Sequence, residues 1–459
     1  MKRGKKHDIE FVDPIASFTP GDAIVLQTGQ RIELEGGDQP GGILSVGDGS
    51  SVTLEAGAGI ESDRDGDVGI LSVGADTSVD IEGFINLAGA NSVGASVRDG
   101  LISLSGELVL DGDGSNGLVL NQPDAHGAIA ARGSIEMNGD SAAAVFAVRS
   151  DSVVNDGEIS TSGAYSTGIF SGDGEVVNTG SIISGGDGSS GIYAAGASQI
   201  TNTGVIEATG EALPSVPGNE GSAAGIYLNW DGAVVTNSGR ISSDHDAGIE
   251  VDPGAGLAVF GFPPPPADTT NTIINEHHGR ISGEVGIRGS DYVEVVENAG
   301  VIDGGIEFGG GDDVYQAVGN GRTNGVIDGG DGNDTLIAGH GRDTLLGGDG
   351  NDLLDGGRSS DVLDGGAGDD VLIGGRGGDL FIFNGGNDII LDMSAADELE
   401  LQGYSLSDAE VEINGEDVTY RWTTSDSLTV VGGADDAPLA KDFQTQEPIY
   451  VPTDDFALA

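Results

Sequence analysis

Short apolar runs alternate with glycine and polar residues over most of this chain, at a nearly constant interval. The interval is marked by a glycine that precedes Ile, Leu or Val, and most successive markers are similarly spaced, as from Gly168 to Gly191. The markers are Gly42-Ile43, Gly69-Ile70, Gly117-Leu118, Gly168-Ile169, Gly191-Ile192, Gly225-Ile226, Gly248-Ile249, Gly286-Ile287 and Gly305-Ile306, with degenerate copies at Gly94 and Ala144-Val145. Such a period predicts the coils of a parallel β-helix over residues 41–310.

A second marker of the form Asn-x-Gly-x-Ile lies within the later coils. Copies begin at Asn155, Asn178, Asn202, Asn237 and Asn298, with a stretched copy at Asn275. Because asparagine tolerates turn geometry and its amide can both donate and accept, we expect these side chains to stack in a ladder. Two coils are longer, with predicted loops from Ala212 and Phe260. The pattern resembles the β-helix repeats of bacterial surface proteins and of polysaccharide-acting enzymes.

From Gly329 to Ile382 the period shortens to nine residues. The six units are GGDGNDTLI, AGHGRDTLL, GGDGNDLLD, GGRSSDVLD, GGAGDDVLI and GGRGGDLFI. An aspartate recurs at Asp334, Asp343, Asp352, Asp361, Asp370 and Asp379, and Leu or Phe follows each one two residues later. Glycines permit tight turns and the apolar residues form a short strand, so each unit is predicted to be a turn followed by a strand.

These nonapeptides closely resemble the RTX family of hemolysin-type calcium-binding repeats. The resemblance implies a β-roll in which two units complete one turn, and Ca²⁺ as the cofactor, with several ions. Ca²⁺ is a hard cation that takes six to eight oxygen ligands, which carbonyl-lined turns with one carboxylate each can supply. We expect the metal at Asp312, Asp313, Gly330, Asp331, Gly332, Asn333, Asp334, Asp343, Gly348, Asp349, Gly350, Asn351, Asp352, Asp361, Gly366, Asp369, Asp370, Asp379 and Asp388.

If alternate units stack, the repeats form two unlike edges. One edge carries the acidic units GGDGND, GGDGND and GGAGDD, and the other carries His340, Arg342, Arg358 and Arg376. We hypothesise that the column of Asp334, Asp352 and Asp370 binds Ca²⁺ more tightly than the column of Asp343, Asp361 and Asp379. The alternative is that the variable positions face solvent and only adjust solubility.

Charge and composition narrow the possible partners. The 459 residues contain 76 acidic and 18 basic residues, a formal charge of −58, which disfavours nucleic acid and anionic lipid as partners. There is no cysteine, and no window is apolar enough to predict a membrane span. The N-terminal MKRGKKHDIEF lacks the apolar stretch of a secretory signal peptide. The RTX resemblance instead implies export by a bacterial type I secretion machinery, for which the tail TDDFALA resembles the signal.

The predicted architecture is all-β. We expect a cap segment at 1–40, a right-handed parallel β-helix at 41–310, an RTX β-roll at 311–392, and a β-rich cap with the secretion signal at 393–459. The helix is expected to continue into the roll as one coaxial rod, with a flexible linker at 317–324 as the alternative.

Catalytic motifs are missing from the sequence. H-E-x-x-H and G-x-S-x-G do not occur, and Asp252-Pro253-Gly254 lacks the histidine of the alginate-epimerase motif that it resembles. The clusters from Asp63 and Asp111 do not fit an EF-hand, so we interpret them as solvated turns, with an extra cation as the alternative. An outward aromatic row of Phe170, Tyr193, Tyr227 and Trp230 is a candidate glycan contact, with a purely structural ladder as the alternative.

Two functions follow from these patterns. The first is a secreted, extracellular or cell-surface protein that folds on Ca²⁺ binding after export and has a structural or adhesive role, with surface or matrix polysaccharide or further copies of itself as partners. The second is a β-helix enzyme of the polysaccharide lyase or epimerase type with an RTX tail. No catalytic residue is assigned.

Overall fold

The computed structural model describes residues 10–11, 15–17, 19, 21–34, 42–120, 122, 124–148, 152–213, 222–229, 232–252 and 270–432. Trp230, the tail TDDFALA and nearly all of the predicted loops from Ala212 and Phe260 lie outside these residues. The chain divides into two compact units, Met1–Arg288 and Gly289–Ala459. The four predicted segments and the coaxial rod stay predictions.

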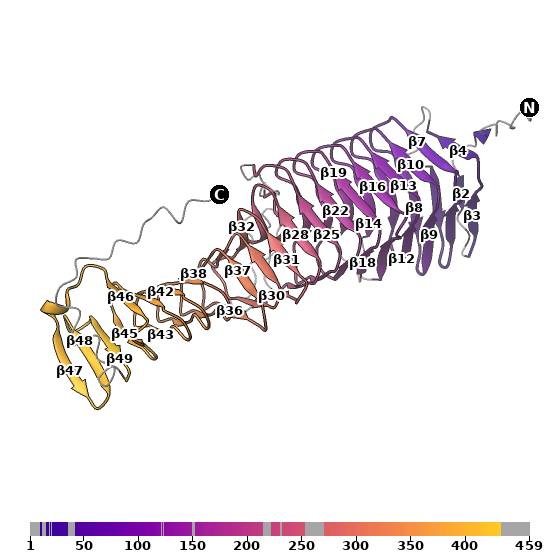
Figure 1. Ribbon diagram of the computed structural model, residues 1–459. Coiled ribbons are helices and arrows are strands. Elements are labelled where there is room, and N and C mark those ends of the chain that lie inside the picture. The colour runs from indigo at the N-terminus through magenta and orange to yellow at the C-terminus, as the bar shows by residue number, and fades with distance from the viewer. Residues whose placement is uncertain are drawn as a thin grey trace, which may run out of the picture. The chain divides into compact units, whose positions relative to one another are not determined.

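The first unit is built from three parallel sheets, to which each coil of the chain adds one strand apiece (Figure 1). The first sheet contains β1 (Glu10–Phe11), β4 (Gln30–Glu33), β7 (Gly59–Ser62), β10 (Phe84–Leu87), β13 (Glu107–Leu110), β16 (Ser134–Met137), β19 (Glu158–Thr161), β22 (Ser181–Ser184), β25 (Val205–Ala208), β28 (Arg240–Ser243) and β31 (Arg280–Ser282).

The second sheet contains β2 (Ile15–Ser17), β5 (Ile43–Val46), β8 (Val68–Val73), β11 (Val93–Val97), β14 (Asn116–Leu120), β17 (Ala143–Ala147), β20 (Thr167–Ser171), β23 (Ser190–Ala194), β26 (Ile226–Leu228), β29 (Ala247–Val251) and β32 (Val285–Arg288). The third contains β3 (Ala23–Leu26), β6 (Ser51–Leu54), β9 (Thr77–Ile81), β12 (Gly100–Leu104), β15 (Ala125–Ile129), β18 (Ser152–Asn155), β21 (Glu175–Asn178), β24 (Gln199–Asn202), β27 (Val234–Asn237) and β30 (Asn271–Asn275). The predicted parallel β-helix is therefore confirmed.

The glycine-aliphatic markers define the core of this unit. From Ile43 through Ile287 the aliphatic members pair in register along the second sheet, and each is fully buried. The preceding glycine is required by close approach, since a Cβ on Gly69 would lie 2.5 Å from the carbonyl oxygen of Gly94 in the next coil. In each marker, the aliphatic residue therefore points into the core and the glycine allows the close contact with the next coil.

The asparagine ladder is confirmed from Asn155 to Asn275, whereas the amide of Asn298 donates to Tyr315 Oη and the Arg322 carbonyl oxygen. The Nδ2 of each asparagine donates to the Oδ1 of the next at 2.8 to 2.9 Å, and all members are fully buried. The ladder comprises Asn155, Asn178, Asn202, Asn237 and Asn275. Because each amide both donates and accepts, the buried column satisfies its own polar atoms.

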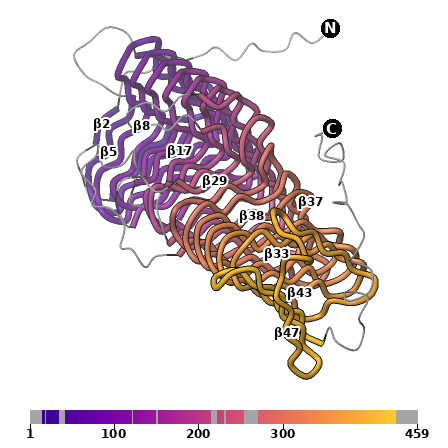
Figure 2. Tube along the Cα trace, turned by 90° about the vertical axis from the view of Figure 1, so that its left-hand side faces the viewer, coloured from indigo at the N-terminus to yellow at the C-terminus, as the bar shows by residue number. Residues whose placement is uncertain are grey.

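In the second unit the coils become shorter, as Figure 2 shows. Hydrogen bonds between successive turns join Glu294 to Asp313, Asp313 to Asp334 and Asp334 to Asp352, over sequence separations of 19, 21 and 18. Among the described residues of this unit, a third sheet contains β34 (Val301–Asp303) and β37 (Arg322–Asn324). The second strand lies within 317–324, the segment considered as an alternative linker.

Two parallel sheets contain most of the other described strands of this unit. One contains β35 (Ile306–Glu307), β38 (Val326–Asp331), β40 (Thr344–Asp349), β42 (Val362–Ala367), β44 (Leu380–Phe383) and β46 (Glu398–Leu401). The other contains β33 (Glu294–Asn298), β36 (Val314–Ala317), β39 (Thr335–Ile337), β41 (Leu353–Asp355), β43 (Val371–Ile373), β45 (Asn387–Ile390) and β49 (Ser427–Val430). Thr335 pairs with Leu353, and Leu353 with Val371, so two nonapeptides complete one turn, as predicted.

A β-rich cap follows the last turn. A 3-10 turn (Leu406–Asp408) leads into the antiparallel strands β47 (Glu410–Asn414) and β48 (Asp417–Arg421), and β49 joins them to β45. The rings of Phe383, Tyr404 and Trp422 pack together with centroids 5.0 to 5.1 Å apart. No helix in the described part of the chain is long and apolar enough to cross a membrane.

Candidate calcium-binding roll

The nonapeptide turns lie along two edges of the roll. The acidic edge comprises the turns 329–334, 347–352 and 365–370, and the basic edge comprises the turns 338–343, 356–361 and 374–379. Each turn connects a strand of one sheet to a strand of the other. At the fourth position of the unit, a Cβ on Gly350 would lie 1.6 Å from the carbonyl oxygen of Gly332, so successive turns stack in close contact.

Glycines supply the left-handed backbone that these turns need. Along the acidic edge φ is 93° at Gly330, 147° at Gly332, 111° at Gly348, 140° at Gly350 and 95° at Gly366. On the basic edge a non-glycine residue, Ser359, has φ 88°, which is strained for a side chain with a Cβ. The left-handed positions just given are therefore all glycine on the acidic edge, whereas one on the basic edge is a serine.

The aspartates of the acidic edge form a buried column. The main-chain N–H of each aspartate donates to Oδ1 of the aspartate in the next turn at 2.7 to 3.1 Å. Its members, which are at most 2% exposed, are Asp313, Asp334, Asp352, Asp370 and Asp388. One oxygen of each carboxylate is therefore used to hold successive turns together.

The basic edge repeats this arrangement with Asp343, Asp361, Asp379 and Asp397. The N–H of each of the first three donates to Oδ1 of the next at 2.9 Å. Asp397 was not predicted, because the nonapeptide pattern ends before it. Its separation of 18 from Asp379, the same as within the repeats, and the leucine two residues later are the signals that identify it. The predicted division of the aspartates into two columns is confirmed.

The second carboxylate oxygen has no protein partner in most of the column members. Oδ2 is buried and makes no hydrogen bond in Asp313, Asp334, Asp343, Asp352, Asp361 and Asp370. A buried acceptor without a partner costs about 1–3 kcal/mol, and more when it is charged. These oxygens are therefore the part of the roll that requires a cation.

Burial raises the pKa of the buried aspartates in both columns. The pKa rises to about 6 for Asp334 and Asp343, to about 7 for Asp352 and Asp361, and to about 8 for Asp313 and Asp388. Burial also raises the pKa of Asp370 and Asp379. The protein alone therefore opposes the charged form, which a bound cation would favour.

On the acidic edge, the glycine that opens each turn leaves space beside the free oxygen. A Cβ on Gly347 would lie 2.3 Å from Asp352 Oδ2 and 2.3 Å from the carbonyl oxygen of Gly365 in the next turn. A Cβ on Gly329 would likewise meet Asp334 Oδ2 at 2.2 Å and the carbonyl oxygen of Gly347 at 2.6 Å. Carboxylate and carbonyl oxygens thus converge on one small space, and this all-oxygen donor set fits Ca²⁺.

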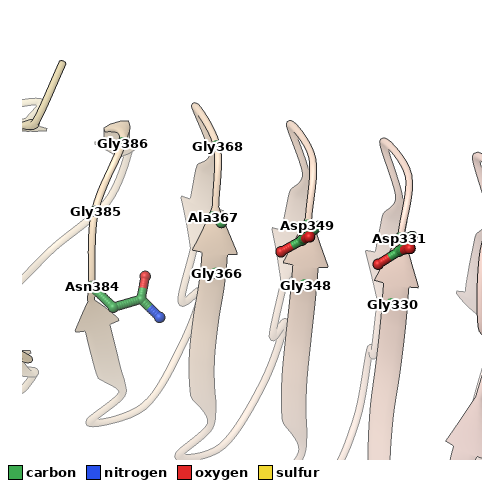
Figure 3. Close-up of a pocket in the computed structure, with 10 residues that line it drawn as sticks. All are labelled: Gly330, Asp331, Gly348, Asp349, Gly366, Ala367, Gly368, Asn384, Gly385 and Gly386. Atoms are coloured by element: carbon green, nitrogen blue, oxygen red, sulfur yellow. The ribbon is translucent and has the colours of Figure 1, made fainter.

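The other predicted ligands lie outside the buried columns. On the acidic edge an exposed ladder runs through Asp312, Asn333, Asn351, Asp369 and Asn387, in which each side-chain oxygen accepts from the main-chain N–H of the next member. Asp331 and Asp349 line an open groove together with Gly330, Gly348, Gly366, Ala367, Gly368, Asn384, Gly385 and Gly386. Figure 3 shows the carboxylates of Asp331 and Asp349 on the same side of successive strands.

No three His, Cys, Asp or Glu side chains come together as a metal cluster in the part of the chain that the structure describes. The EF-hand-like clusters of the first unit are used in turns, since Asp65 Oδ1 accepts from the N–H of Ala90 at 2.9 Å and Asp113 Oδ1 accepts from the N–H of Asp140 at 3.0 Å. Their interpretation as β-helix turns agrees with these bonds.

The aromatic row differs from the predicted glycan contact. Phe146, Phe170, Tyr193 and Tyr227 stack with centroids 4.9 to 5.4 Å apart, so the faces of their rings cover one another. Tyr227 is only 1% exposed, and its hydroxyl donates to Asp252 Oδ2 at 2.6 Å. Sugar stacking needs an open ring face, and the rings of Phe170, Tyr193 and Tyr227 are instead packed as a structural ladder.

One charged cluster bears on the enzymatic alternative. Arg288 Nη1 lies 2.7 Å from Asp246 Oδ1 and 3.4 Å from Glu250 Oε1, and Ser222 Oγ donates to Glu250 Oε2. Burial and the charge of Asp246 raise the pKa of Glu250. Because the members engage one another, this arrangement favours a structural ion-pair network, and we assign no catalytic residue.

Comparison with known proteins agrees with the geometry of the roll. The family model described as RTX calcium-binding nonapeptide repeat (4 copies) matches residues 321–354, 328–363 and 355–390. Neither the curated proteins nor the solved structures contain a significant match to this chain. Residues 321–390, with their turns of two nonapeptides and their two aspartate columns, are RTX calcium-binding nonapeptide repeats.

Proposed function

We propose that this is a secreted bacterial protein whose second unit folds when Ca²⁺ binds after export, and whose β-helix has a structural or adhesive role outside the cell. The observation that carries the proposal is the row of buried aspartate oxygens without partners. In a calcium-poor cytosol these carboxylates repel one another and their Oδ2 atoms lack hydrogen bonds, so the roll stays unfolded.

Calcium outside the cell reverses this balance. A site that binds only the folded state gains about 1.4 kcal/mol at a tenfold excess of Ca²⁺ over Kd and about 2.7 kcal/mol at a hundredfold excess. Because adjacent turns share hydrogen bonds through Asp Oδ1, each bound ion also orders the turns above and below it. Several modest sites can therefore fold the whole roll.

The structural role of the first unit is supported by what its side chains do. The marker aliphatics, the asparagine ladder and the aromatic row are each occupied in holding coils together. Stacked coils of this kind present a long, regular surface, which suits a scaffold or an adhesive surface protein.

Circular dichroism and limited proteolysis of the full chain test the proposal. In excess EGTA we expect protease cleavage throughout 289–432, while the region 42–288 stays protected because its ladders need no metal. Adding Ca²⁺ should restore strand signal and protection of the second unit, and Mg²⁺ at equal concentration is the control. Equal protection of the second unit with and without Ca²⁺ would contradict the proposal.

A further inference from the structure

We infer that the acidic edge holds a further divalent cation before the repeats begin, between the turns Gly289–Glu294 and Phe308–Asp313, with the carboxylates of Glu294 and Asp313 as its ligands. These turns precede the region 321–390 that matches the repeat family. The inference rests on the proposed function, because the turns stack directly on the repeats and share their hydrogen bonds.

The aspartate column of the acidic edge continues upward into these turns. The N–H of Asp313 donates to Asp334 Oδ1 at 2.7 Å, and the N–H of Glu294 donates to Asp313 Oδ1 at 2.6 Å. Glu294 therefore occupies the position of the repeat aspartate, two steps before Asp334. These steps have sequence separations of 19 and 21 instead of 18, which hides the relation from a search for a fixed period.

The space beside Gly289 resembles the space beside the first glycine of the repeats. A Cβ on Gly289 would lie 2.2 Å from the carbonyl oxygen of Phe308 and 2.9 Å from Glu294 Oε2. The corresponding atoms near Gly329 are the carbonyl oxygen of Gly347 and Asp334 Oδ2. A carboxylate oxygen and a carbonyl oxygen from the next turn therefore converge here as they do in the repeats.

Asp313 provides the independent sign of a missing ligand. It is fully buried, and its Oδ2 makes no hydrogen bond. Glu294, Asp334 and Asp312 place further negative charge close to Asp313. Two buried carboxylates on adjacent turns, linked by the hydrogen bond from the Glu294 N–H to Asp313 Oδ1, carry the charge that a divalent cation neutralises.

The upper site differs from the repeat sites in ways that are specific to this chain. Glutamate replaces aspartate at residue 294, and Phe308 stands where the repeats have a glycine. The longer glutamate side chain reaches back to its own turn, where it accepts from Ser290 Oγ at 2.7 Å and from the Ser290 N–H at 3.2 Å. These bonds orient the Glu294 carboxylate within its own turn.

The number of ions per chain tests the inference directly. Equilibrium dialysis of the full chain against radioactive Ca²⁺ should show one ion fewer for Asp313→Asn and one fewer for Glu294→Gln. The double variant should also lose one ion, because both side chains hold the same one. Asp291→Asn is the matched control, since Asp291 is exposed on the same turn and should keep every ion.

A second readout locates the lost ion. The repeats 329–382 contain no Tyr or Trp, whereas Tyr292 lies in the upper turn and Tyr315 follows Asp313. Terbium bound at the upper site should therefore be excited through tyrosine, and Asp313→Asn should lose a larger share of this emission than Asp352→Asn.

The outcomes separate this site from the proposed function. Unchanged ion number and unchanged terbium emission in Asp313→Asn would overturn the upper site alone, provided that Asp352→Asn still loses an ion. Loss of two ions by the double variant would overturn the shared site. Absence of Ca²⁺ binding by the unmodified chain would overturn the proposed function itself. Far-UV circular dichroism in saturating Ca²⁺ checks that each variant folds, and either single variant suffices for the count.

Discussion

The two units use the same device with different chemistry. In the first unit a buried column of asparagines links successive coils, and in the second unit buried columns of aspartates link successive turns. An amide has a donor and an acceptor, so Asn178 donates to Asn202 and Asn202 donates to Asn237, and the ladder needs no further ligand. A carboxylate only accepts, so Asp352 uses Oδ1 for the neighbouring turn and is left with an unpaired Oδ2. The two ladders therefore differ in one atom per residue, which is an amide nitrogen in asparagine and a second carboxylate oxygen in aspartate. The ladder with the nitrogen is self-sufficient, and the ladder with the oxygen needs a cation.

The largest expected difference between the units is their response to pH in the absence of calcium. The pKa of Asp352 and of Asp361 is raised to about 7, against about 3.9 for an unfolded aspartate. Between these values the folded state binds more protons than the unfolded state, so its stability falls as pH rises. In EGTA we expect the second unit to be ordered near pH 4 and to unfold as pH rises towards 8, followed by circular dichroism.

Calcium and protons compete for the same oxygens, so the dependence should reverse when calcium is present. Ca²⁺ affinity should rise from pH 5 to pH 8 as the aspartates lose protons. The first unit is the internal control, because its asparagine ladder does not titrate. A second unit that gained stability with rising pH in EGTA would contradict the assignment of these buried carboxylates.

Replacing a ladder asparagine of the first unit by aspartate should produce the next largest effect, which is a loss of stability. Asn202→Asp removes the donor that bonds Asn237 Oδ1 at 2.8 Å and the Arg240 carbonyl oxygen at 3.1 Å. A buried charge then faces two acceptors, so the free energy of unfolding of the first unit should fall by about 2–4 kcal/mol in denaturant titrations. Asn86→Asp is the control, since Asn86 is exposed on β10 and should change stability by less than about 0.5 kcal/mol.

The reverse exchange, Asp352→Asn, should make the calcium-free roll easier to fold and remove one ion. The new amide nitrogen can take the position of the unpaired Oδ2 and act as a hydrogen-bond donor. The carbonyl oxygen of Gly365 is the nearby acceptor, since it borders the same space beside Gly347. Far-UV circular dichroism in EGTA should therefore show more strand in this variant than in the unmodified chain. Less strand would indicate that the carboxylate stabilises the roll even without metal.

The smallest expected effect distinguishes the two edges of the roll. The acidic edge has Asp331 and Asp349 beside its turns, whereas His340, Arg358 and Arg376 stack along the basic edge. We expect Asp352→Ala to weaken Ca²⁺ binding by roughly threefold more than Asp361→Ala, or about 0.6 kcal/mol, in calorimetric titrations. An equal loss of Ca²⁺ affinity in both variants would instead favour the alternative that the variable residues of the turns face solvent and only adjust solubility.

The basic edge also differs within its first turn. Ala338 replaces the opening glycine of this turn. Its methyl group stands at the position where, in the turn of Asp352, Gly347 leaves space beside the carboxylate. Asp343 nevertheless has an unpaired Oδ2. The variant Ala338→Gly should therefore strengthen binding on the basic edge and reduce the difference between the two edges.

Much of this architecture follows from spacing. The interval between Gly168-Ile169 and Gly191-Ile192 predicted the coil, and the structure pairs those isoleucines in register. The nine-residue period likewise predicted that Asp334 and Asp352 stack in one column and Asp343 and Asp361 in the other. A strict period fixes which residues become neighbours, because each added turn repeats the previous one.

Predictions from spacing failed where the period breaks or where orientation matters. Glu294 and Asp397 belong to the columns, but irregular steps and the loss of the glycine pattern hide them. The aromatic row was placed correctly along the second sheet, yet its ring faces cover each other and Tyr227 is buried. Whether the ring faces are covered depends on the distance between successive coils and on the residues that pack around the rings. The alternation of residues along one strand does not specify either.

The sequence by itself determined the repeat, the register and the residue types that stack, because hydrophobic burial and turn geometry depend on local spacing. The tertiary structure decided which atoms remain without partners. The two oxygens of Asp352 are equivalent in the sequence, and only the stacking of turns assigns Oδ1 to the N–H of Asp334 and leaves Oδ2 beside a carbonyl oxygen of the next turn. The need for a cation arises from that assignment.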